Sequence, residues 1–192
     1  KLYTDNFNLK CTPVYNASGY VECNPVAVQN PVRIIHHGVA TSNRKLERMA
    51  QMMDYLNEEY TLDLMVDPAG SEKNAYKILK QEVFKRKTVK LIEPVGFKDI
   101  VKTLNQYDIG LYIFPPVNLN SLYALPNKFF EFIQARLAIA VAPSPEMKRI
   151  VERYDLGIVS GDFTPQAMAE QINKLTPQKI GYYKNQCHKF AK

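Results

Sequence analysis

Residues 121–161, SLYALPNKFFEFIQARLAIAVAPSPEMKRIVERYDLGIVSG, decide the fold of this chain because they alternate helical and strand patterns. An aromatic segment with helical spacing (127–136) precedes a short apolar run (137–141), and a second helical segment (145–154) precedes a second run (157–160). Both runs are nearly continuous rather than alternating, which is typical of strands buried on both faces of a parallel sheet. The stretch therefore predicts consecutive units of a layered α/β domain.

The same alternation extends upstream to residue 32. Further strands are expected at 32–37, 62–66, 89–92 and 109–114, and further helices at 43–59 (capped by Asn43), 71–84, 97–104 and 164–175. Six strands separated by helices predict a doubly wound, Rossmann-like α/β domain with about six parallel strands and right-handed crossovers.

The two ends of the chain differ from this pattern. Residues 1–31 are rich in Pro, Asn and Val without a helical period, which predicts an interdomain linker with one or two extended segments. Residues 177–192 have helical spacing of apolar side chains and predict a C-terminal helix. The expected organisation is therefore a linker (1–31), a Rossmann-like domain (32–176) and a terminal helix (177–192).

The composition indicates which cellular compartment and which cofactors to expect. The 192 residues are 46% hydrophobic, enough for one buried core. The three cysteines are odd in number and lack metal-ligand spacing, which favours a reducing compartment and predicts no metal site. No apolar run is long enough to span a membrane and no signal peptide is visible, so we expect a soluble, cytoplasmic protein.

The net charge of +6 predicts an anionic partner: nucleic acid, a phosphate-bearing small molecule or an acidic membrane surface. The densest basic group comprises Lys85, Arg86, Lys87 and Lys90. This group lacks the interleaved aromatic residues that nucleic-acid binding favours, and we interpret it as a solvated helix end. No nucleic-acid partner is expected.

In parallel sheets, ligands bind beyond the carboxyl ends of the strands, where helix N-termini offer free N–H groups to anions. In HHGVATSNRKLE (36–47), Gly38 lets the backbone approach a ligand closely. Arg44 or Lys45 then stands at a helix start, where a cation is unfavourable for the helix dipole. Such a cation either holds a phosphate or points into water. His36 and His37 end the strand, one expected to face inward and the other outward, and we interpret them as structural.

The LPNKFFE turn (125–131) offers the second group of candidate ligands. Pro126 fixes a bend, Asn127 is placed to cap the next helix, and Lys128 puts a cation in its first turn. Glu131 shares a helical face with Lys128. The pair either brackets a phosphate and a ribose or forms a surface ion pair. Because the adjacent phenylalanines predict a buried helix, the charges on it require an explanation.

These residues resemble a known family. LPNKFFEFIQARLAIAVAPSPEMKRIVERYDLGIVSG, together with YDIGLYIF and HHGVATSNRKLERM upstream, is similar to the C-terminal, donor-binding half of GT-B glycosyltransferases, specifically the retaining group related to glycosyltransferase family 4 (glycosyl transferases group 1). The resemblance covers residues 32–175. It implies a UDP-sugar as the most favoured donor, with no metal ion and no cofactor.

The resemblance also implies roles for individual residues. Gly38, Arg44 and Lys128 would contact the donor diphosphate, and Glu131 would hold the ribose hydroxyls. The remaining candidates flank the base (Pro94 and Val95) or lie near the donor sugar (Asn118, Asn120, Tyr123 and Asn127).

Four positions depart from the family pattern. Tyr123 stands where a second carboxylate is expected, eight residues before Glu131, so that Asn118 or Asn120 would have to substitute for it. Arg136 replaces a Gly, Ala138 replaces a Pro, and Val39 replaces a basic residue. These departures leave the contact to the donor sugar and the identity of the donor open.

The resulting hypothesis is the nucleotide-sugar donor-binding domain of a retaining glycosyltransferase in polysaccharide or glycolipid biosynthesis. Its expected partners are an N-terminal GT-B domain, an acceptor sugar or lipid-linked glycan, and a membrane surface touched by the full-length enzyme. The isolated chain is expected to be inactive. Two alternatives are a GT-B-like sugar-nucleotide epimerase domain and a non-catalytic α/β binding or regulatory module. A receiver-like module would need an acidic pocket where RIIHHG (33–38) offers histidines.

Overall fold

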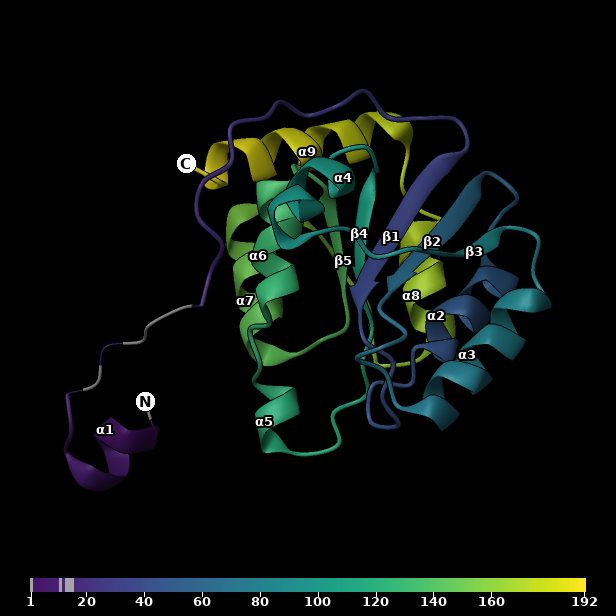
Figure 1. The fold of residues 1–192 in the computed structure, drawn as a ribbon. Coiled ribbons are helices and arrows are strands. Elements are labelled where there is room, and N and C mark those ends of the chain that lie inside the picture. The colour runs from purple at the N-terminus through teal and green to yellow at the C-terminus, as the bar shows by residue number, and fades with distance from the viewer. Residues whose placement is uncertain (1, 11, 13–15) are drawn as a thin grey trace.

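The computed structural model describes residues 2–10, 12 and 16–192, and its centre is a six-stranded parallel sheet (Figure 1). The strand order is β3-β2-β1-β4-β5-β6, and all neighbouring strands are parallel. The strands are β1 (Val32–Gly38), β2 (Tyr60–Val66), β3 (Val89–Ile92), β4 (Ile109–Tyr112), β5 (Ala138–Val141) and β6 (Gly157–Val159). The predicted doubly wound, Rossmann-like fold is confirmed.

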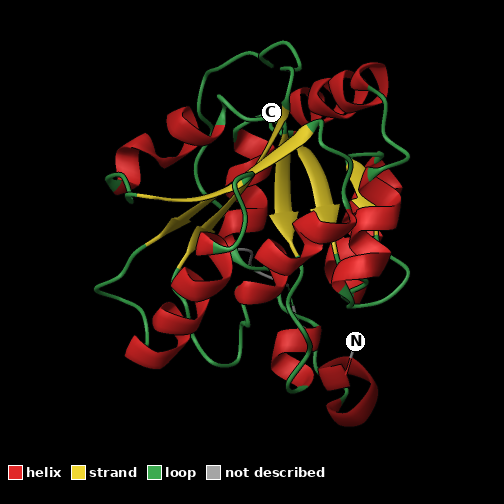
Figure 2. Cartoon of the chain, turned by 90° about the vertical axis from the view of Figure 1, so that its right-hand side faces the viewer, coloured by secondary structure: helices red, strands yellow, loops and turns green. Residues whose placement is uncertain are grey.

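Helices cover both faces of the sheet (Figures 1 and 2). One layer holds α2 (Glu47–Met52), α3 (Lys73–Phe84) and α8 (Pro165–Ile172). The other holds α4 (Ile100–Leu104), α6 (Asn127–Gln134) and α7 (Pro145–Tyr154), while α9 (Pro177–Phe190) contributes Ile180 and Tyr183 to the first core and Cys187 to the second. Shorter elements are α1 (Leu2–Phe7), α5 (Leu119–Leu122) and the 3-10 turns η1 (Met53–Tyr55) and η2 (Phe97–Asp99).

Successive residues of a strand enter the two cores alternately. In β1, Ile34 packs into the core under α2 and α3, whereas Ile35 packs into the core under α6, and neither is exposed. Burying such a side chain contributes about 1.5–3 kcal/mol. Because both faces are covered, the strands read as continuous apolar runs.

Gly110 in β4 allows α6 to lie close against the sheet. A Cβ atom at this position would lie 2.5 Å from Cγ of Phe132. The Phe132 ring therefore packs directly on the strand backbone, and any larger residue at position 110 would push α6 outward. This contact helps to fix α6, and with it the side chain of Lys128.

Several predicted details are wrong. The helix expected at 43–59 is shorter, because α2 begins only at Glu47 and gives way to η1; Leu46, not Asn43, is its N-cap residue. Asn127 does not cap α6, because Pro126 holds the N-cap position in extended backbone. Two helices were missed: α1, within the expected linker, and α5, which Asn118 and Ser121 start with a capping box.

The expectation that one histidine faces inward and the other outward is also wrong. His36 is fully buried and His37 is 7% exposed. The two side chains do point to opposite faces of β1, but helices cover both faces, so that both rings are buried and only a small part of His37 is exposed.

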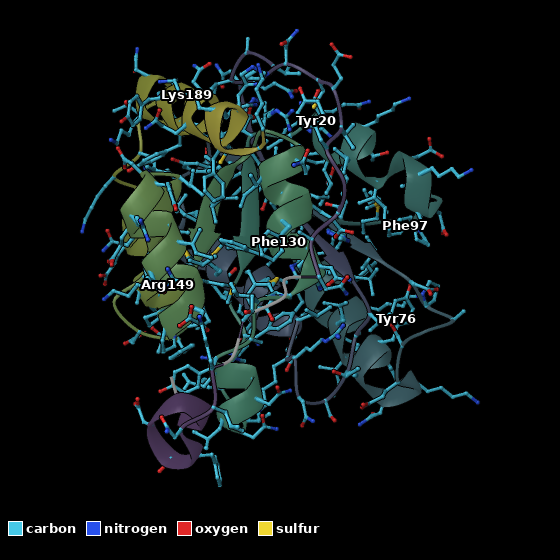
Figure 3. All side chains as sticks on the ribbon, turned by 90° about the vertical axis from the view of Figure 1, so that its left-hand side faces the viewer. Tyr20, Tyr76, Phe97, Phe130, Arg149 and Lys189 are labelled. Carbon is cyan, nitrogen blue, oxygen red and sulfur yellow. The ribbon has the colours of Figure 1, made fainter. Side chains whose placement is uncertain are left out.

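Residues 16–31, which we call the N-terminal segment, contain no helix or strand in the described structure and lie against the amino end of the sheet. Figure 3 labels Tyr20 on this segment and Lys189 on α9. The Gln134 side chain holds both elements: its Oε1 accepts from the Val21 N–H at 3.0 Å, and its Nε2 donates to the Ala191 carbonyl at 2.9 Å.

Two of the departures from the family pattern have structural explanations here. Arg136 adopts a left-handed backbone (φ 61°), which favours glycine, but its buried guanidinium donates to the carbonyl of Val21 at 2.9 Å and to that of Gln134. At the start of β5, the Ala138 N–H donates to the Asp108 carbonyl at 2.9 Å. A proline there would lack this N–H.

Candidate anion-binding site at the carboxyl end of the sheet

The candidate site lies where the strand order reverses, between the carboxyl ends of β1 and β4. Doubly wound sheets bind ligands at such a switch point, because the loops that follow the two strands diverge to opposite faces. Here β1 ends at Gly38 and β4 ends at Tyr112. The first turn of α6 lies against the same place and supplies Lys128.

Lys128 is the central group of the site. Its side chain is buried, and its Nζ atom has no hydrogen-bond partner among the described residues. The ammonium lies 2.6 Å from the position that a Cβ atom on Gly38 would occupy. Gly38 has a φ of +139°, so both its backbone and its missing side chain require glycine. A buried ammonium without a partner is costly, which indicates a site shaped for an anion.

Arg44 brings a second cation to the same point. Its Nη1 atom is 3.7 Å from the Cβ position of Gly38 and donates to the Val39 carbonyl at 3.1 Å. The Arg44 guanidinium therefore lies beside the backbone of Val39. The Phe114 ring lies beneath both charges, 5.4 Å from Lys128 Nζ and 6.0 Å from Arg44 Cζ.

The surroundings lower the pKa of Lys128 to about 7, first through burial and then through the nearby charge of Arg44. Glu131 acts in the opposite direction but more weakly. An anion placed between Lys128 and Arg44 would favour the protonated amine and offset the repulsion of the two cations. The site is therefore electrostatically incomplete without an anion.

Glu131 does not pair with Lys128 in the described structure, although the two residues are one helical turn apart, so the alternative of a surface ion pair does not hold. Its Oε2 lies 3.1 Å from His37 Nε2 instead, close enough for an ion pair but outside hydrogen-bonding angles. Burial lowers the pKa of His37, so the imidazole is neutral at neutral pH. The carboxylate thus keeps acceptor capacity for a ligand's hydroxyl groups.

His36 also has an unused nitrogen. Its Nδ1 lies 2.8 Å from the Leu111 carbonyl, which can only accept, so Nδ1 carries the proton and Nε2 presents a lone pair. Burial and the charge of Lys128 lower the pKa of His36 well below its usual range. In the described residues four buried side-chain N or O atoms lack a partner, and three of them belong to His36, His37 and Lys128. Unsatisfied polar groups therefore concentrate at this site.

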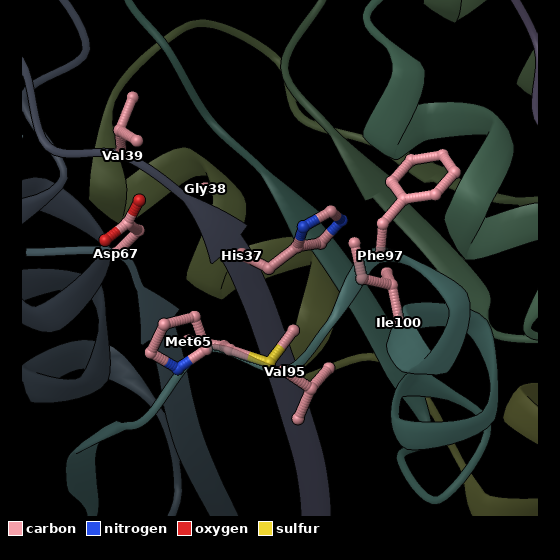
Figure 4. A pocket seen from close by; sticks show the side chains of 9 residues that line it. His37, Gly38, Val39, Met65, Asp67, Val95, Phe97 and Ile100 are labelled. Atoms are coloured by element: carbon pink, nitrogen blue, oxygen red, sulfur yellow. The ribbon is translucent and has the colours of Figure 1, made fainter. Parts of the chain in front are cut away.

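A pocket of about 270 Å³ opens beside Gly38 (Figure 4). Pro94 and Val95, the predicted base-flanking residues, line it together with Gly38. The other lining residues are His37, Val39, Met65, Asp67, Phe97 and Ile100. A mostly apolar slot next to two cations suits a planar ring attached to a phosphate.

The structure thus brings together Gly38, Arg44 and Lys128, and places Glu131 against His37 beside them. The residues predicted near the donor sugar do not join this cluster. Asn118 is used as a cap for α5, and the side chain of Tyr123 is 53% exposed. Asn120, in α5, and Asn127, the first residue of α6, are likewise exposed.

Sequence reasoning missed three members of the site. His37 was interpreted as structural, although it lies against Glu131; its place immediately before Gly38 was the available signal. Asp67 and Phe97 were not singled out. Both follow carboxyl ends of strands, where ligand-binding side chains are expected, so their position in the βα loops could have identified them.

Two searches bear on other kinds of site. The described residues contain no group of three or more His, Cys, Asp or Glu side chains placed to hold a metal ion. None of the helices in the described ranges combines the length and apolar character that crossing a membrane requires.

Comparison with known proteins identifies the architecture. No protein-family model matches the sequence, and no curated protein matches it. Solved structures, in contrast, do match this chain. The chain superimposes on WaaG, a glycosyltransferase involved in lipopolysaccharide biosynthesis, with a TM-score of 0.62 and 13% identity over 85% of this chain and 44% of WaaG.

Two further structures agree. Anabaena HepE, solved in complex with UDP-glucose, matches with a TM-score of 0.67 and 17% identity over 82% of this chain and 43% of HepE. The C-terminal domain of the group 1 glycosyltransferase LpcC from Francisella tularensis matches with a TM-score of 0.63 and 13% identity over 89% of this chain and 92% of that domain.

The chain has the fold of the C-terminal half of a GT-B glycosyltransferase. It spans less than half the length of WaaG and HepE but nearly all of the separate LpcC domain.

Proposed function

We propose that this chain is the nucleotide-sugar donor-binding domain of a retaining glycosyltransferase. The observation that carries the proposal is the Lys128 ammonium, which is buried, without a partner in the described structure, and directed at Gly38 beside the Arg44 guanidinium. Two cations that converge on a glycine at a switch point are suited to a diphosphate.

Each part of a nucleotide diphosphate has a counterpart in the site. Lys128 and Arg44 would bind the diphosphate, Glu131 would accept hydrogen bonds from the ribose hydroxyls, and the pocket at Pro94 and Val95 would receive the base. The volume of about 270 Å³ favours a pyrimidine, the smaller class of base. UDP-glucose bound to HepE, a protein of the same fold, supports a UDP-sugar as donor.

The chemistry required of this half of the enzyme is electrostatic. When the bond from the anomeric carbon to the diphosphate breaks, negative charge develops on the leaving group, and cations already positioned there stabilise it. We infer a metal-independent departure, with the two side chains in the role that a metal ion would otherwise have. Residues that bind and activate the acceptor would belong to a separate N-terminal domain.

The biological setting follows from the same proposal. The acceptor would be a sugar or a lipid-linked glycan in polysaccharide or glycolipid biosynthesis, assembled on the cytoplasmic side. Because acceptor-binding residues would lie outside this chain, we expect it to bind the donor without transferring the sugar. Sugar transfer by the purified chain, measured with a labelled donor, would contradict this division of labour.

Calorimetric titration of the chain with UDP, GDP, CDP and ADP tests the proposal. We expect saturable binding of one diphosphate, and binding weakened roughly 10–100-fold by Lys128→Met, the loss expected when a hydrogen bond to a charged group is removed. Lys148→Met, which removes an exposed lysine of α7, is the matched control. Equal affinities for the native chain and Lys128→Met, or no binding of any diphosphate, would refute the proposed site.

A further inference from the structure

The outer face of α3 carries a basic stripe that ends in an exposed aromatic ring. Lys73, Lys77, Lys80 and Phe84 are spaced by four, three and four residues, which places them on one side of the helix. All four are exposed, and Phe84, at 93%, is the most exposed large hydrophobic side chain in the described residues. Phe84 therefore contributes almost no apolar burial to this domain and remains available to a partner.

The surface around Phe84 is a shallow hollow of about 540 Å³, lined by Lys80, Gln81, Phe84 and Lys85. It is larger than the pocket beside Gly38, which measures about 270 Å³. It is not a small-molecule site, however, because it is open and its polar groups are flexible lysine termini rather than fixed donors. Its size and openness suit an extended surface.

The positive charge of this face is largely free. Among the described residues, Lys73, Lys77 and Lys80 lie within ion-pair distance of no carboxylate. Glu82, the one acidic residue in α3, pairs with Lys85 and Arg86. Lys87 and Lys90 continue the positive charge past the end of the helix to the edge strand β3, where both line a second hollow.

We propose that the α3 face, comprising Lys73, Lys77, Lys80, Phe84 and Lys85, docks this protein on an anionic lipid surface. Phe84 enters the headgroup layer, and the lysine ammonium groups lie against the phosphates around it. This combination of a basic helical face with an aromatic side chain is how interfacial helices bind membranes. The proposal is independent of the donor site.

The same features argue against nucleic acid as the partner. A single-stranded nucleic acid requires a groove that follows its backbone and several rings on which bases stack, whereas this face offers one shallow hollow beside a single exposed ring. Arg86, the only arginine at this end of α3 in the described structure, is engaged by Asp54 and Glu82.

Docking through α3 is compatible with an open donor site. The residues that line the pocket beside Gly38 come from β1, β2 and the loops after them, and from the region 94–100. In Figure 1, α3 lies at the β3 edge of the molecule, away from α6 and its Lys128. A lipid surface against α3 therefore leaves the switch point accessible.

Co-sedimentation of the full 192-residue chain with vesicles tests the docking surface. We expect binding to vesicles of phosphatidylglycerol and phosphatidylcholine in equal parts, and none to pure phosphatidylcholine. Lys77→Glu/Lys80→Glu should weaken binding about thirtyfold or more, because one lysine near an anionic surface contributes roughly fivefold in affinity. Phe84→Ala should weaken it about tenfold through lost apolar burial.

Lys102→Glu/Lys174→Glu is the matched control, because it makes the same charge change at exposed positions outside α3. It should retain most of the binding, and all variants should melt at the native temperature, since the changed side chains are exposed. Absence of binding to anionic vesicles, or equal losses in the control and test variants, would overturn the proposal. So would a single-stranded oligonucleotide that binds more tightly than the vesicles and loses affinity in Lys77→Glu/Lys80→Glu but not in Phe84→Ala.

Discussion

The two ends of the sheet differ in whether a buried lysine has hydrogen-bond partners. At the amino end, Asp108 accepts hydrogen bonds from Lys184 Nζ at 3.0 Å and from the Arg33 N–H at 3.0 Å, and Lys184 also donates to the Tyr107 carbonyl at 2.8 Å. At the carboxyl end, Lys128 is also buried, but its Nζ has no hydrogen-bond partner in the described structure.

This difference separates structural charges from functional ones. A buried ion pair with all its hydrogen bonds satisfied holds elements together and needs no further group. A buried cation without a partner destabilises the folded state, and it persists where a ligand supplies the missing anion. The sign of a mutation's effect on stability should therefore differ between the two ends.

Asp108→Ala should have the largest effect on stability. It leaves the Lys184 ammonium buried without its carboxylate, and we expect a loss of about 3–5 kcal/mol in the free energy of unfolding. Urea denaturation measures it. The double variant Asp108→Ala/Lys184→Met should recover much of the loss, because it removes the unpaired charge. A loss below about 1 kcal/mol in the single variant would show that this pair does not support the fold.

Lys128→Met should have the opposite sign. Its apolar side chain fills the same space without an unpaired charge, and we expect the folded state to gain about 2 kcal/mol at pH 6. The pKa of Lys128 is about 7 in the folded chain, against 10.5 as its ordinary value. Between these values the unfolded chain binds the extra proton, so native stability rises with pH. The advantage of Lys128→Met should therefore shrink between pH 7 and pH 10. Denaturation at pH 6 and pH 9 measures both effects, and a destabilised variant would contradict them.

The affinity for a nucleoside diphosphate should fall with pH in the same window. Bound diphosphate favours the protonated Lys128, so binding above pH 7 takes up a proton, and affinity should drop by up to about tenfold per pH unit. Calorimetry in two buffers of different ionisation enthalpy measures the proton uptake. In Lys128→Met this pH dependence should be absent, and its persistence would assign the effect to another group.

Arg136→Gly should have the smallest effect. Glycine relieves the left-handed backbone but removes the hydrogen bonds to Val21 and Gln134, so we expect a net loss of about 1 kcal/mol. Arg136→Ala keeps the backbone strain and should lose about 1 kcal/mol more. Thermal unfolding compares the two variants, and limited proteolysis should show earlier cleavage in residues 16–31. If the glycine variant is as stable as the native chain, the hydrogen bond from Arg136 to Val21 makes no net contribution to stability.

The fold was predictable because hydrophobic runs report burial directly. The six strands and the helices at 71–84 and 145–154 lie close to their expected positions, since their patterns depend on local sequence alone. The start of α2 was not predictable in this way. Lys45 adopts a left-handed backbone (φ 47°) that interrupts the helix expected from Asn43, and nothing in its residue type indicates this.

The candidate site was predictable where one residue carried its own signal. Gly38 and Lys128 were expected from a glycine at a strand end and from a cation at a helix start, whereas the family resemblance was needed to choose Arg44 over Lys45; the structure brings Gly38, Arg44 and Lys128 together. The contact between His37 and Glu131 was not predictable, because it depends on which helix covers which face of β1. Sequence alternation gives the face of a side chain but not the element packed against it.

The two hydrogen bonds of the Gln134 side chain connect the N-terminal segment mechanically to α6. One side-chain amide holds Val21 and Ala191, so tension between these two residues enters α6 at its last turn. Lys128 stands in the first turn of the same helix, about 10 Å away along a rigid axis. A pull on the N-terminal segment therefore reaches the ammonium along one continuous helix, without a flexible loop to absorb it.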